Sequence, residues 1–390
     1  MSSPDAREAP PGIFLARPER VGAGLRLAVK DLFDSAALTT TYGSAIFAEH
    51  VPARSAEAIL SLERAGYALT AKANLHEFAW GITSENPHFG DVPNPLAPDR
   101  IAGGSSGGCA AALVAGLVDA ALGTDSAGSI RIPSACCGTV GFKPTHGLVS
   151  LEGCFPLAPS FDHAGPMARD VAGCEAMMEA LVPGFEPREL SSFDGLEVGA
   201  LWIDEADPGV RARIVEALAL MPGAHSADLP TAAPCYAAFM PEAANVHREL
   251  YREQGGLYGR NVATKVERAL AFTVEQGEAG RRARGEYRRL FRDLMSSWPD
   301  LLVAPTLACV APPTGIGDLA LREELIRFTF PFNAVGAPAL ALPCGAAENG
   351  LPASLQLVGR PGEDALVLAA GRLLERLIAG LPRGRGVGRG

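Results

Sequence analysis

Two serines in glycine-rich segments and one lysine have the side chains needed for hydrolysis by an activated alcohol. Ser105 lies in IAGGSSGG, Ser129 lies in GTDSAGSIRIP, and Lys30 directly follows the apolar segment LRLAV. A serine hydroxyl is a weak nucleophile until a base removes its proton, and a lysine can be that base only when it is uncharged. Burial and neighbouring cations can lower a lysine pKa by several units. The three residues therefore predict nucleophilic catalysis, provided that the fold brings them together.

The segment 103–108 has three interpretations on its own. A phosphate-binding P-loop ends in Gly-Lys-Ser/Thr, whereas this segment continues Gly-Gly-Cys, so that motif is excluded. Residues 103–107 match G-x-S-x-G, the nucleophile turn of α/β-hydrolases, which would make Ser105 the nucleophile and require a later acid and histidine. A flexible loop before a helix is the third interpretation. The candidate bases for the second are His146, His163, His225 and His247.

The segments around these residues predict the elements that must position them. LRLAV (25–29) is typical of a buried strand, RSAEAILSLERA (54–65) has apolar residues at helical spacing, and GYALTAKANL (66–75) predicts a turn and a strand. The alanine-rich run 109–118 predicts a buried helix whose N-terminus, with its free N–H groups, lies at the loop of Ser105. This alternation of strands and helices predicts an α/β fold.

The second half of the chain has a different pattern of apolar and charged residues. LEVGALWI (196–203) predicts a strand, and EAGRRARGEYRRLFRDLMSSW predicts an amphipathic helix with a solvated, arginine-rich face. Strand-like segments return at 300–308 and 338–345. The core is therefore expected to form from both ends of the chain. The last residues, RGRGVGRG, predict a flexible basic tail.

Composition and charge limit the class of protein. The chain has 390 residues, of which 48% are hydrophobic and 20% charged, far from the composition of disordered proteins. Its formal net charge of -10 argues against a broad nucleic-acid surface, which needs clustered Lys and Arg. The longest apolar run, 109–122, is short for a bilayer span and contains Asp119. We see no secretory signal and expect a cytoplasmic protein without membrane contact.

The cysteines do not indicate a metal site or a disulfide framework. The eight cysteines include no C-x-x-C pair, so we expect buried, reduced thiols and no metal. We likewise expect apolar packing, rather than thiol chemistry, for Cys136 and Cys137.

Seven ordered segments resemble the amidase signature family of amide hydrolases. In the first half they are AVKDLFD (28–34), KANLHEFAWG (72–81), TSENPHFGDVPNPLAPDRIAGGSSGG (83–108), ALGTDSAGSIRIPSACCGTVGFKPTHGLVS (121–150) and PLAPSFDHAGPMARD (156–170). In the second half they are PDLLVAPT (299–306) and the region from FNAVGAPALALPCG to GLPASLQLVGRPGED (332–364). The segment SENPHFGDVPNPLAPDR and the short stretch before Lys30 resemble the shorter members, such as indole-acetamide hydrolases.

The resemblance assigns a role to each of the three residues. It implies Ser129 as the nucleophile, Ser105 as a bridging serine that relays the proton, and Lys30 as the base. It also implies a cis peptide bond between Gly104 and Ser105. The implied oxyanion hole consists of the backbone N–H groups of Ser126, Ala127 and Gly128. The family usually has Gly where Ala127 stands, so the shape of this turn is an open point.

Supporting roles are expected for residues that flank these loops. Asp125 and Arg131 are expected to pair and brace the nucleophile loop. His163 is expected to be a hydrogen-bonding structural residue rather than a base. The supporting residues are Gly104, Ser106, Asp125 and Arg131.

The resemblance implies one large α/β domain with a central mixed β-sheet covered by helices on both faces. The expected organisation is a flexible N-terminal extension at 1–24, an amidase domain at 25–380 and a flexible basic tail at 381–390. Within the domain, the catalytic core is expected at 25–170 and 299–375, with a variable substrate-pocket region at about 175–298.

The implied activity is hydrolysis of a carboxylic amide to the acid and ammonia or an amine, through an acyl-enzyme and without a cofactor. A glutaminase-type subunit of a tRNA-dependent amidotransferase is the alternative. A catalytically silent scaffold is a third hypothesis, against which the intact Lys30, Ser105 and Ser129 count. The expected partner is a small-molecule amide, without nucleic acid or membrane, and a homodimer stays open. Because the region that would line the pocket is the least recognisable, the sequence does not identify the acyl group.

Overall fold

The computed structural model describes residues 9–36 and 38–381. The expected flexible tail, apart from residue 381, lies outside the described residues, as do the first eight residues of the expected N-terminal extension. Within the described residues, no helix combines the length and the apolar character that crossing a bilayer would require.

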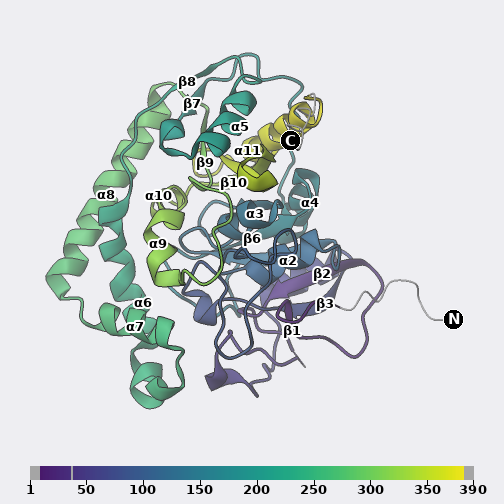
Figure 1. The fold of residues 1–390 in the computed structure, drawn as a ribbon, viewed down its shortest axis with the longest axis vertical. Coiled ribbons are helices and arrows are strands. Elements are labelled where there is room, and N and C mark those ends of the chain that lie inside the picture. Colours follow the sequence, from purple (N-terminus) through teal and green to yellow (C-terminus); the bar gives the residue numbers. More distant parts are fainter. Residues whose placement is uncertain (1–8, 37, 382–390) are drawn as a thin grey trace, which may run out of the picture.

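A mixed β-sheet forms the centre of the molecule (Figure 1). Its eleven strands in the described residues follow the order β1-β3-β2-β4-β6-β5-β10-β11-β9-β7-β8. Both parallel and antiparallel neighbours occur, so the predicted mixed sheet is confirmed. The strands are β1 (Phe14–Ala16), β2 (Leu25–Lys30), β3 (Tyr67–Ala73), β4 (Ala120–Asp125), β5 (Val140–Lys143), β6 (His163–Ala168), β7 (Val198–Ala200), β8 (Ala224–Ser226), β9 (Leu301–Pro305), β10 (Ala339–Ala346) and β11 (Pro352–Val358).

Helices cover both faces of this sheet, as predicted. Along β2, Leu27 and Val29 face one hydrophobic cluster and Ala28 faces another, because successive side chains of a strand point to opposite faces. The first face packs against α1, α4, α5 and α11, and the second packs against α2, α3 and α10. The helices are α1 (Glu57–Arg64), α2 (Gly107–Val114), α3 (Arg131–Cys137), α4 (Val171–Leu181), α5 (Pro208–Leu218), α6 (Tyr236–Gln254), α7 (Arg260–Leu270), α8 (Val274–Ser297), α9 (Asp318–Ile326), α10 (Phe330–Val335) and α11 (Asp364–Ala379).

Part of the region between β6 and β9 forms an outer helical layer. Helices α6, α7 and α8 pack against one another at one side of the molecule (Figure 1). Helix α8, predicted from its amphipathic pattern, begins at a capping box in which Thr273 and Gln276 satisfy each other's backbone N–H groups. The same region also adds β7 and β8 to one edge of the sheet.

The N-terminal segment joins the sheet earlier than expected. Strand β1 pairs antiparallel with β3, so the sheet begins before Leu25, the residue at which we expected the domain to start. Three half-buried residues are too few to show the alternation of apolar and polar residues that identifies a strand.

The eight cysteines are free thiols, and six of them are buried. The expectation of mostly buried thiols is confirmed. Cys136 and Cys137 lie within the core clusters, where apolar packing surrounds them.

Candidate functional site

Two neighbouring parallel strands bring Lys30 to a hydroxyl-lined position. Strand β2 pairs in parallel with β4, so Lys30 at the carboxyl end of β2 lies beside the carboxyl end of β4. The Lys30 Nζ donates to Thr124 Oγ1 of β4 at 2.7 Å and to Ser105 Oγ at 2.7 Å. Lys30 is fully buried, and it makes no ion pair among the described residues. Its immediate polar partners are therefore two uncharged hydroxyls.

The loop of Ser105 is held by close backbone packing. The Gly104–Ser105 peptide bond is cis. A Cβ atom at Gly104 would lie 2.8 Å from the backbone nitrogen of Ser84, so this position requires glycine. The neighbouring Ser106 Oγ donates to the Thr124 carbonyl at 3.2 Å. Residue 106 also precedes α2, which places the Ser105 loop at the N-terminus of a buried helix, as predicted.

Ser129 lies in the turn between β4 and α3, next to the Ser105 loop. The Ser106 N–H donates to the Ser129 carbonyl at 3.2 Å, which joins the two serine loops directly. Ser129 is 5% exposed. Its hydroxyl and the Ser105 hydroxyl do not hydrogen-bond each other in this structure. The fold thus brings Lys30, Ser105 and the Ser129 loop together from three separate parts of the sequence.

Burial changes the acidity of Lys30. Loss of solvent lowers the Lys30 pKa from 10.5 to about 8, although Cys109, Cys154, Asp125 and Asp162 partly oppose the shift. About a tenth of the lysine is then uncharged at pH 7. A lysine with this pKa can accept a proton and return it near neutral pH.

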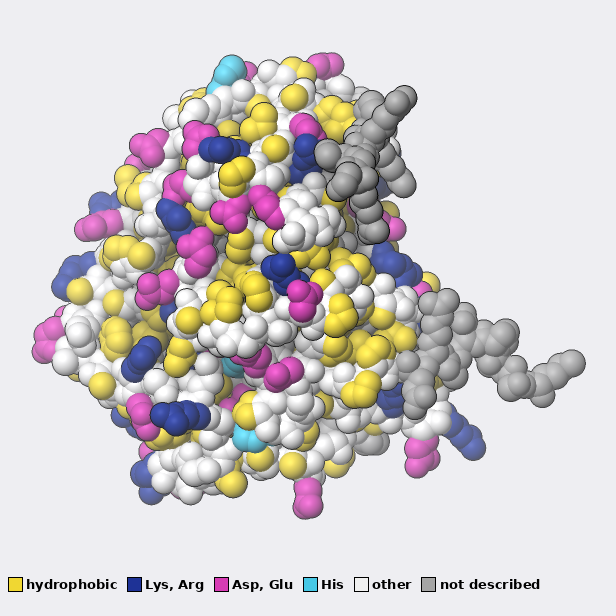
Figure 2. All heavy atoms as spheres, viewed as in Figure 1, with side chains coloured by type: hydrophobic (Ala, Val, Ile, Leu, Met, Phe, Trp, Pro, Cys, Tyr) yellow, Lys and Arg dark blue, Asp and Glu magenta, His cyan; other side chains and the backbone are white. Residues whose placement is uncertain are grey.

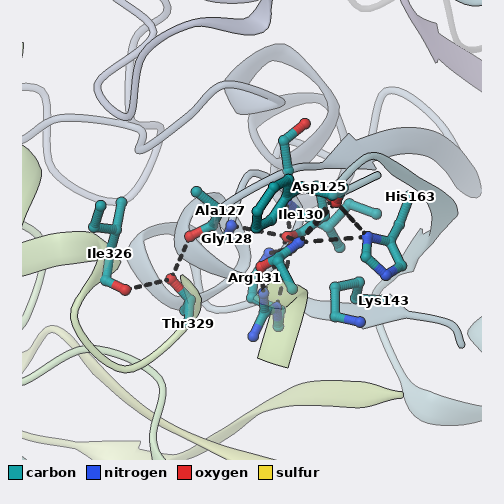
Figure 3. Close-up of polar contacts among 12 residues, drawn as sticks. Asp125, Ala127, Gly128, Ile130, Arg131, Lys143, His163, Ile326 and Thr329 are labelled. Carbon is teal, nitrogen blue, oxygen red and sulfur yellow. Dashed lines mark hydrogen bonds and ion pairs between the residues drawn. The ribbon is translucent and has the colours of Figure 1, made fainter. Parts of the chain in front are cut away.

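A buried ion pair braces the loop of Ser129. Asp125 and Arg131 are both fully buried, and the guanidinium contacts the two carboxylate oxygens at 3.0 Å each. Burial opposes ionisation of Asp125, but Arg131 and the surrounding hydrogen bonds hold the pKa of its carboxyl well below its usual range. Figure 3 shows the two side chains pointing toward each other beneath the turn.

Side chains from distant parts of the chain form further hydrogen bonds with both members of this ion pair. The Asn333 side chain donates to Asp125 Oδ1 at 2.8 Å and to the Asp125 carbonyl at 2.9 Å. The remaining guanidinium N–H groups of Arg131 donate to Asn333 Oδ1 at 2.7 Å and to Gln356 Oε1 at 2.9 Å. The Ser129 loop is therefore positioned by α10 and β11 as well as by its own strand.

Only some backbone N–H groups of the turn at 126–129 take part in hydrogen bonds within the described residues. The Gly128 N–H donates to Asp125 Oδ1 at 2.8 Å, so it is engaged inside the protein. The N–H groups of Ser126, Ala127 and Ser129 donate to no atom of the described residues. The Ala127 carbonyl accepts a 2.6 Å hydrogen bond from the Thr329 hydroxyl, which fixes the orientation of the turn (Figure 3).

Replacing Gly128 with alanine should distort this turn. Gly128 has a φ of +131°, and an added Cβ would lie 2.3 Å from Thr329 Oγ1 and 2.8 Å from Ile132 Cδ1. We expect the variant to lose about 1–3 kcal/mol of stability and most of its amide hydrolysis, measured by thermal unfolding and ammonia release. Gly184 has a φ of +78° in open space, so Gly184→Ala is the control for backbone strain alone. Equal activity of the two variants would contradict this account.

None of the four histidines considered as bases hydrogen-bonds to the Ser105 hydroxyl. The His163 Nδ1 is 2.7 Å from the Phe161 carbonyl and 3.1 Å from the Asp125 carbonyl, and burial lowers its pKa well below the ordinary value. His146 contacts the Pro159 carbonyl and His247 contacts the Tyr258 hydroxyl. No histidine side chain hydrogen-bonds to Ser105 within the described residues; the His76 backbone N–H donates to the Ser105 carbonyl at 3.3 Å, and the Ser105 hydroxyl is held by Lys30. The arrangement therefore does not match the serine–histidine pair of an α/β-hydrolase.

On the face drawn in Figure 2, Lys and Arg side chains are interspersed with Asp and Glu. A surface of this kind lacks the continuous basic stripe on which nucleic-acid backbones bind.

Comparison with known proteins places the chain in a family. The model of the family described as Amidase matches residues 7–191 and 243–368. A glutamyl-tRNA(Gln) amidotransferase subunit of Methanospirillum hungatei JF-1 is 32% identical over 398 residues, which covers 89% of this chain and 91% of that protein. The AtzE subunit of the 1-carboxybiuret hydrolase of Pseudomonas sp. (strain ADP) is 36% identical over 386 residues, covering 90% of this chain and 84% of that protein.

The fold agrees with the sequence match. The crystal structure of an amidase superimposes with a TM-score of 0.82 and 36% identity, over 91% of this chain and 85% of the other. The two matched regions of the family model contain Lys30, both serine loops, Asn333 and Gln356. The chain therefore belongs to the amidase family and is an enzyme that hydrolyses amide C–N bonds.

Proposed function

We propose that this enzyme hydrolyses a small carboxylic amide through a Ser129 acyl-enzyme, with Ser105 as the proton relay and Lys30 as the base. The observation that carries the proposal is the contact of 2.7 Å between Lys30 Nζ and Ser105 Oγ, in a buried position where the described residues offer the lysine no carboxylate partner. A carboxylate in contact with the lysine would keep it charged, whereas hydroxyl partners leave it able to accept a proton.

In the proposed acylation step, the Ser129 oxygen attacks the amide carbon. Its proton passes to Ser105 while the Ser105 proton passes to Lys30, so each group gives or receives one proton. The link between the Ser106 N–H and the Ser129 carbonyl supports this relay, because it keeps the two loops adjacent. The relay requires the Ser129 and Ser105 hydroxyls to come within hydrogen-bond distance, and catalytic contacts often shorten only when substrate is bound.

We assign stabilisation of the oxyanion to the free N–H groups of this turn. An amide carbonyl oxygen gains negative charge during attack, and preorganised donors lower the energy of that state. Ser126 and Ala127, two of the three residues expected from the sequence, have such free groups, and the Ser129 N–H is a third. Because the Gly128 N–H is engaged by Asp125, we assign Gly128 the role of shaping the turn.

Collapse of the tetrahedral intermediate completes the proposed cycle. The C–N bond breaks as Ser105 gives its proton to the leaving nitrogen and receives one from Lys30. Water then attacks the Ser129 ester, again with Lys30 and Ser105 as base and relay, and releases the acid. Every proton transfer in this cycle is carried by the chain's own side chains.

The proposed role of Lys30 predicts a pH dependence. Because the base must be uncharged, kcat/KM should rise with pH and reach half of its maximum near the lowered Lys30 pKa of about 8. Initial rates of ammonia release measured across roughly pH 6 to 10 test this expectation. Lys30→Ala should lose most of its activity and also lose this titration. A rate that instead falls as pH rises through this range would contradict the assignment of Lys30 as base.

A second candidate function follows from the relatives. Several of them are named as subunits of glutamyl-tRNA(Gln) amidotransferases, with 32–35% identity across about nine-tenths of this chain. In that case this chain would hydrolyse glutamine within a complex, and tRNA would bind through the complex. We favour hydrolysis of a free amide because the chain is also 36% identical to a protein named as a subunit of a hydrolase and 36% identical to an amidase of known crystal structure.

The deciding experiment uses the purified full-length chain. Ammonia release is measured with butyramide, benzamide, indole-3-acetamide and glutamine as substrates. Release from one or more of the first three, without added protein, supports the independent amidase. Release from glutamine that depends on proteins co-purified from the source cell supports the amidotransferase role. We place this activity in the cytoplasm and expect neither nucleic acid nor membrane to be required.

A further inference from the structure

A small cavity lies beside the proposed base. Its volume is about 120 Å³, and two of its lining residues are Thr124, which accepts a hydrogen bond from Lys30, and Ser126 of the proposed oxyanion turn. Leu32, two residues after Lys30, also lines it. The rest of the wall is mainly apolar and comes from the segment between β5 and β6. These residues are Leu151, Cys154, Phe155, Pro156, Leu157, Pro159 and Asp162.

The position of Lys30 determines which part of a substrate this cavity can hold. During collapse of the tetrahedral intermediate, the proton must travel from the Lys30–Ser105 pair to the leaving nitrogen. That nitrogen therefore lies on the same side of the reacting carbon as the lysine, and the acyl group extends away from it. A cavity lined by the hydroxyl partner of Lys30 is thus on the leaving-group side.

Asp162 gives the cavity its polar character. The carboxylate is 5% exposed, and it accepts hydrogen bonds from the Ser126 hydroxyl at 2.5 Å and from the Leu157 and Ala158 N–H groups at 2.9 and 3.0 Å. These contacts fix both the cavity wall and the first residue of the oxyanion turn. Burial raises the Asp162 pKa. An acidic group in a confined apolar wall disfavours an anionic ligand and tolerates an uncharged or cationic one.

We infer that this cavity receives the leaving group, and that it restricts the enzyme to amides of ammonia or of short amines without an anionic group. This inference rests on the proposed function, because it needs Lys30 and Ser105 to deliver the proton. The volume accommodates only a few non-hydrogen atoms. A long N-alkyl chain would exceed this volume and extend past the leucine and proline side chains of the wall.

The test varies the leaving group and keeps the acyl group constant. The most rapidly hydrolysed primary amide of the panel above is compared with its N-isobutyl, N-octyl and N-carboxymethyl derivatives. We expect kcat/KM to fall roughly ten-fold or more from N-isobutyl to N-octyl. We also expect the N-carboxymethyl amide to react more slowly than the N-isobutyl amide of similar shape, because its charge meets Asp162.

Two leucine variants test whether this cavity causes the preference for short leaving groups. Leu151 and Leu148 are both half-buried and pack against the same hydrophobic cluster, but only Leu151 lines the cavity. Leu151→Ala should raise kcat/KM for the N-octyl amide several-fold relative to the primary amide. Leu148→Ala is the matched control and should leave that ratio unchanged, while costing similar stability in thermal unfolding.

The outcomes separate this inference from the function on which it rests. If the wild-type enzyme cleaves the primary and N-octyl amides with equal kcat/KM, the inference is overturned and the amidase activity stands. If Leu151→Ala changes the preferred acyl length of primary amides instead, the cavity holds the acyl group and the inference is again overturned. If no amide is hydrolysed, the proposed function and the inference are both overturned.

Discussion

Ser129→Ala should lower kcat for amide hydrolysis by about 10⁴-fold or more, while leaving the fold intact. Without the hydroxyl, the enzyme has no nucleophile to form the acyl intermediate, and the remaining oxyanion donors and the binding site provide only residual catalysis. The side chain is small and lies in a turn, so its removal leaves no large cavity. Ammonia release under saturating substrate measures the loss, and thermal unfolding verifies that the variant is folded.

Two controls make this result specific. Ser192→Ala changes an exposed serine outside the site and should retain wild-type activity. Phenylmethylsulfonyl fluoride should label the peptide that contains Ser129 in the wild-type enzyme, and mass spectrometry identifies the labelled residue. Labelling of Ser105, together with near-normal turnover by Ser129→Ala, would reverse the proposed roles of the two serines.

Arg131→Met should destabilise the enzyme by about 3–5 kcal/mol, the largest effect on folding that we expect from a single substitution at this site. The change removes the cation that contacts both oxygens of Asp125 and leaves a fully buried carboxylate without an ionic partner. It also removes the donors to Asn333 and Gln356. Chemical denaturation measures the loss, and turnover should fall with it because the turn of the proposed nucleophile Ser129 is no longer braced.

A surface ion pair provides the matched control for this substitution. Arg169 lies 3.2 Å from Asp119, and its side chain is 47% exposed. Solvent screens such a pair, so Arg169→Met should cost less than about 1 kcal/mol. Adding Asp125→Asn to Arg131→Met should recover part of the lost stability, because it removes the uncompensated charge. Equal destabilisation by the two arginine variants would show that the buried pair stabilises the fold no more than the surface pair does.

Much of the fold around the site could be predicted from local sequence patterns. The apolar segment before Lys30, the helix at 54–65 and the glycine-to-alanine transition after Ser105 correspond to β2, α1 and the start of α2. Each is a strong local signal, because apolar periodicity and glycine-rich turns act within a few residues. The contact between Lys30 and Ser105 was expected only from the resemblance to a family, since 75 residues separate them.

Other parts of the site depend on contacts that no local pattern encodes. Thr124 was not among the expected residues, although the parallel pairing of β2 with β4 places it beside Lys30. Strand pairing is set by the packed sheet, so this register could not be read from either segment alone. Asn333 and Gln356 reach Arg131 across 202 and 225 residues. The Asp125 side chain likewise determines which of the expected N–H groups of the turn stay free, because it accepts a hydrogen bond from the Gly128 N–H.

The dependence of the Ser129 turn on Asn333 and Gln356 has a consequence for biosynthesis. A ribosome adds residues from the N-terminus, so Lys30, Ser105 and Ser129 leave the exit tunnel long before the two groups that hold the Asp125–Arg131 pair. Until then, that pair lacks the amide groups that complete its burial. Contacts of such large sequence separation form late and slow the search for the native state. We therefore expect catalytic competence to arise only after Asn333 and Gln356 have been translated and have packed against this pair.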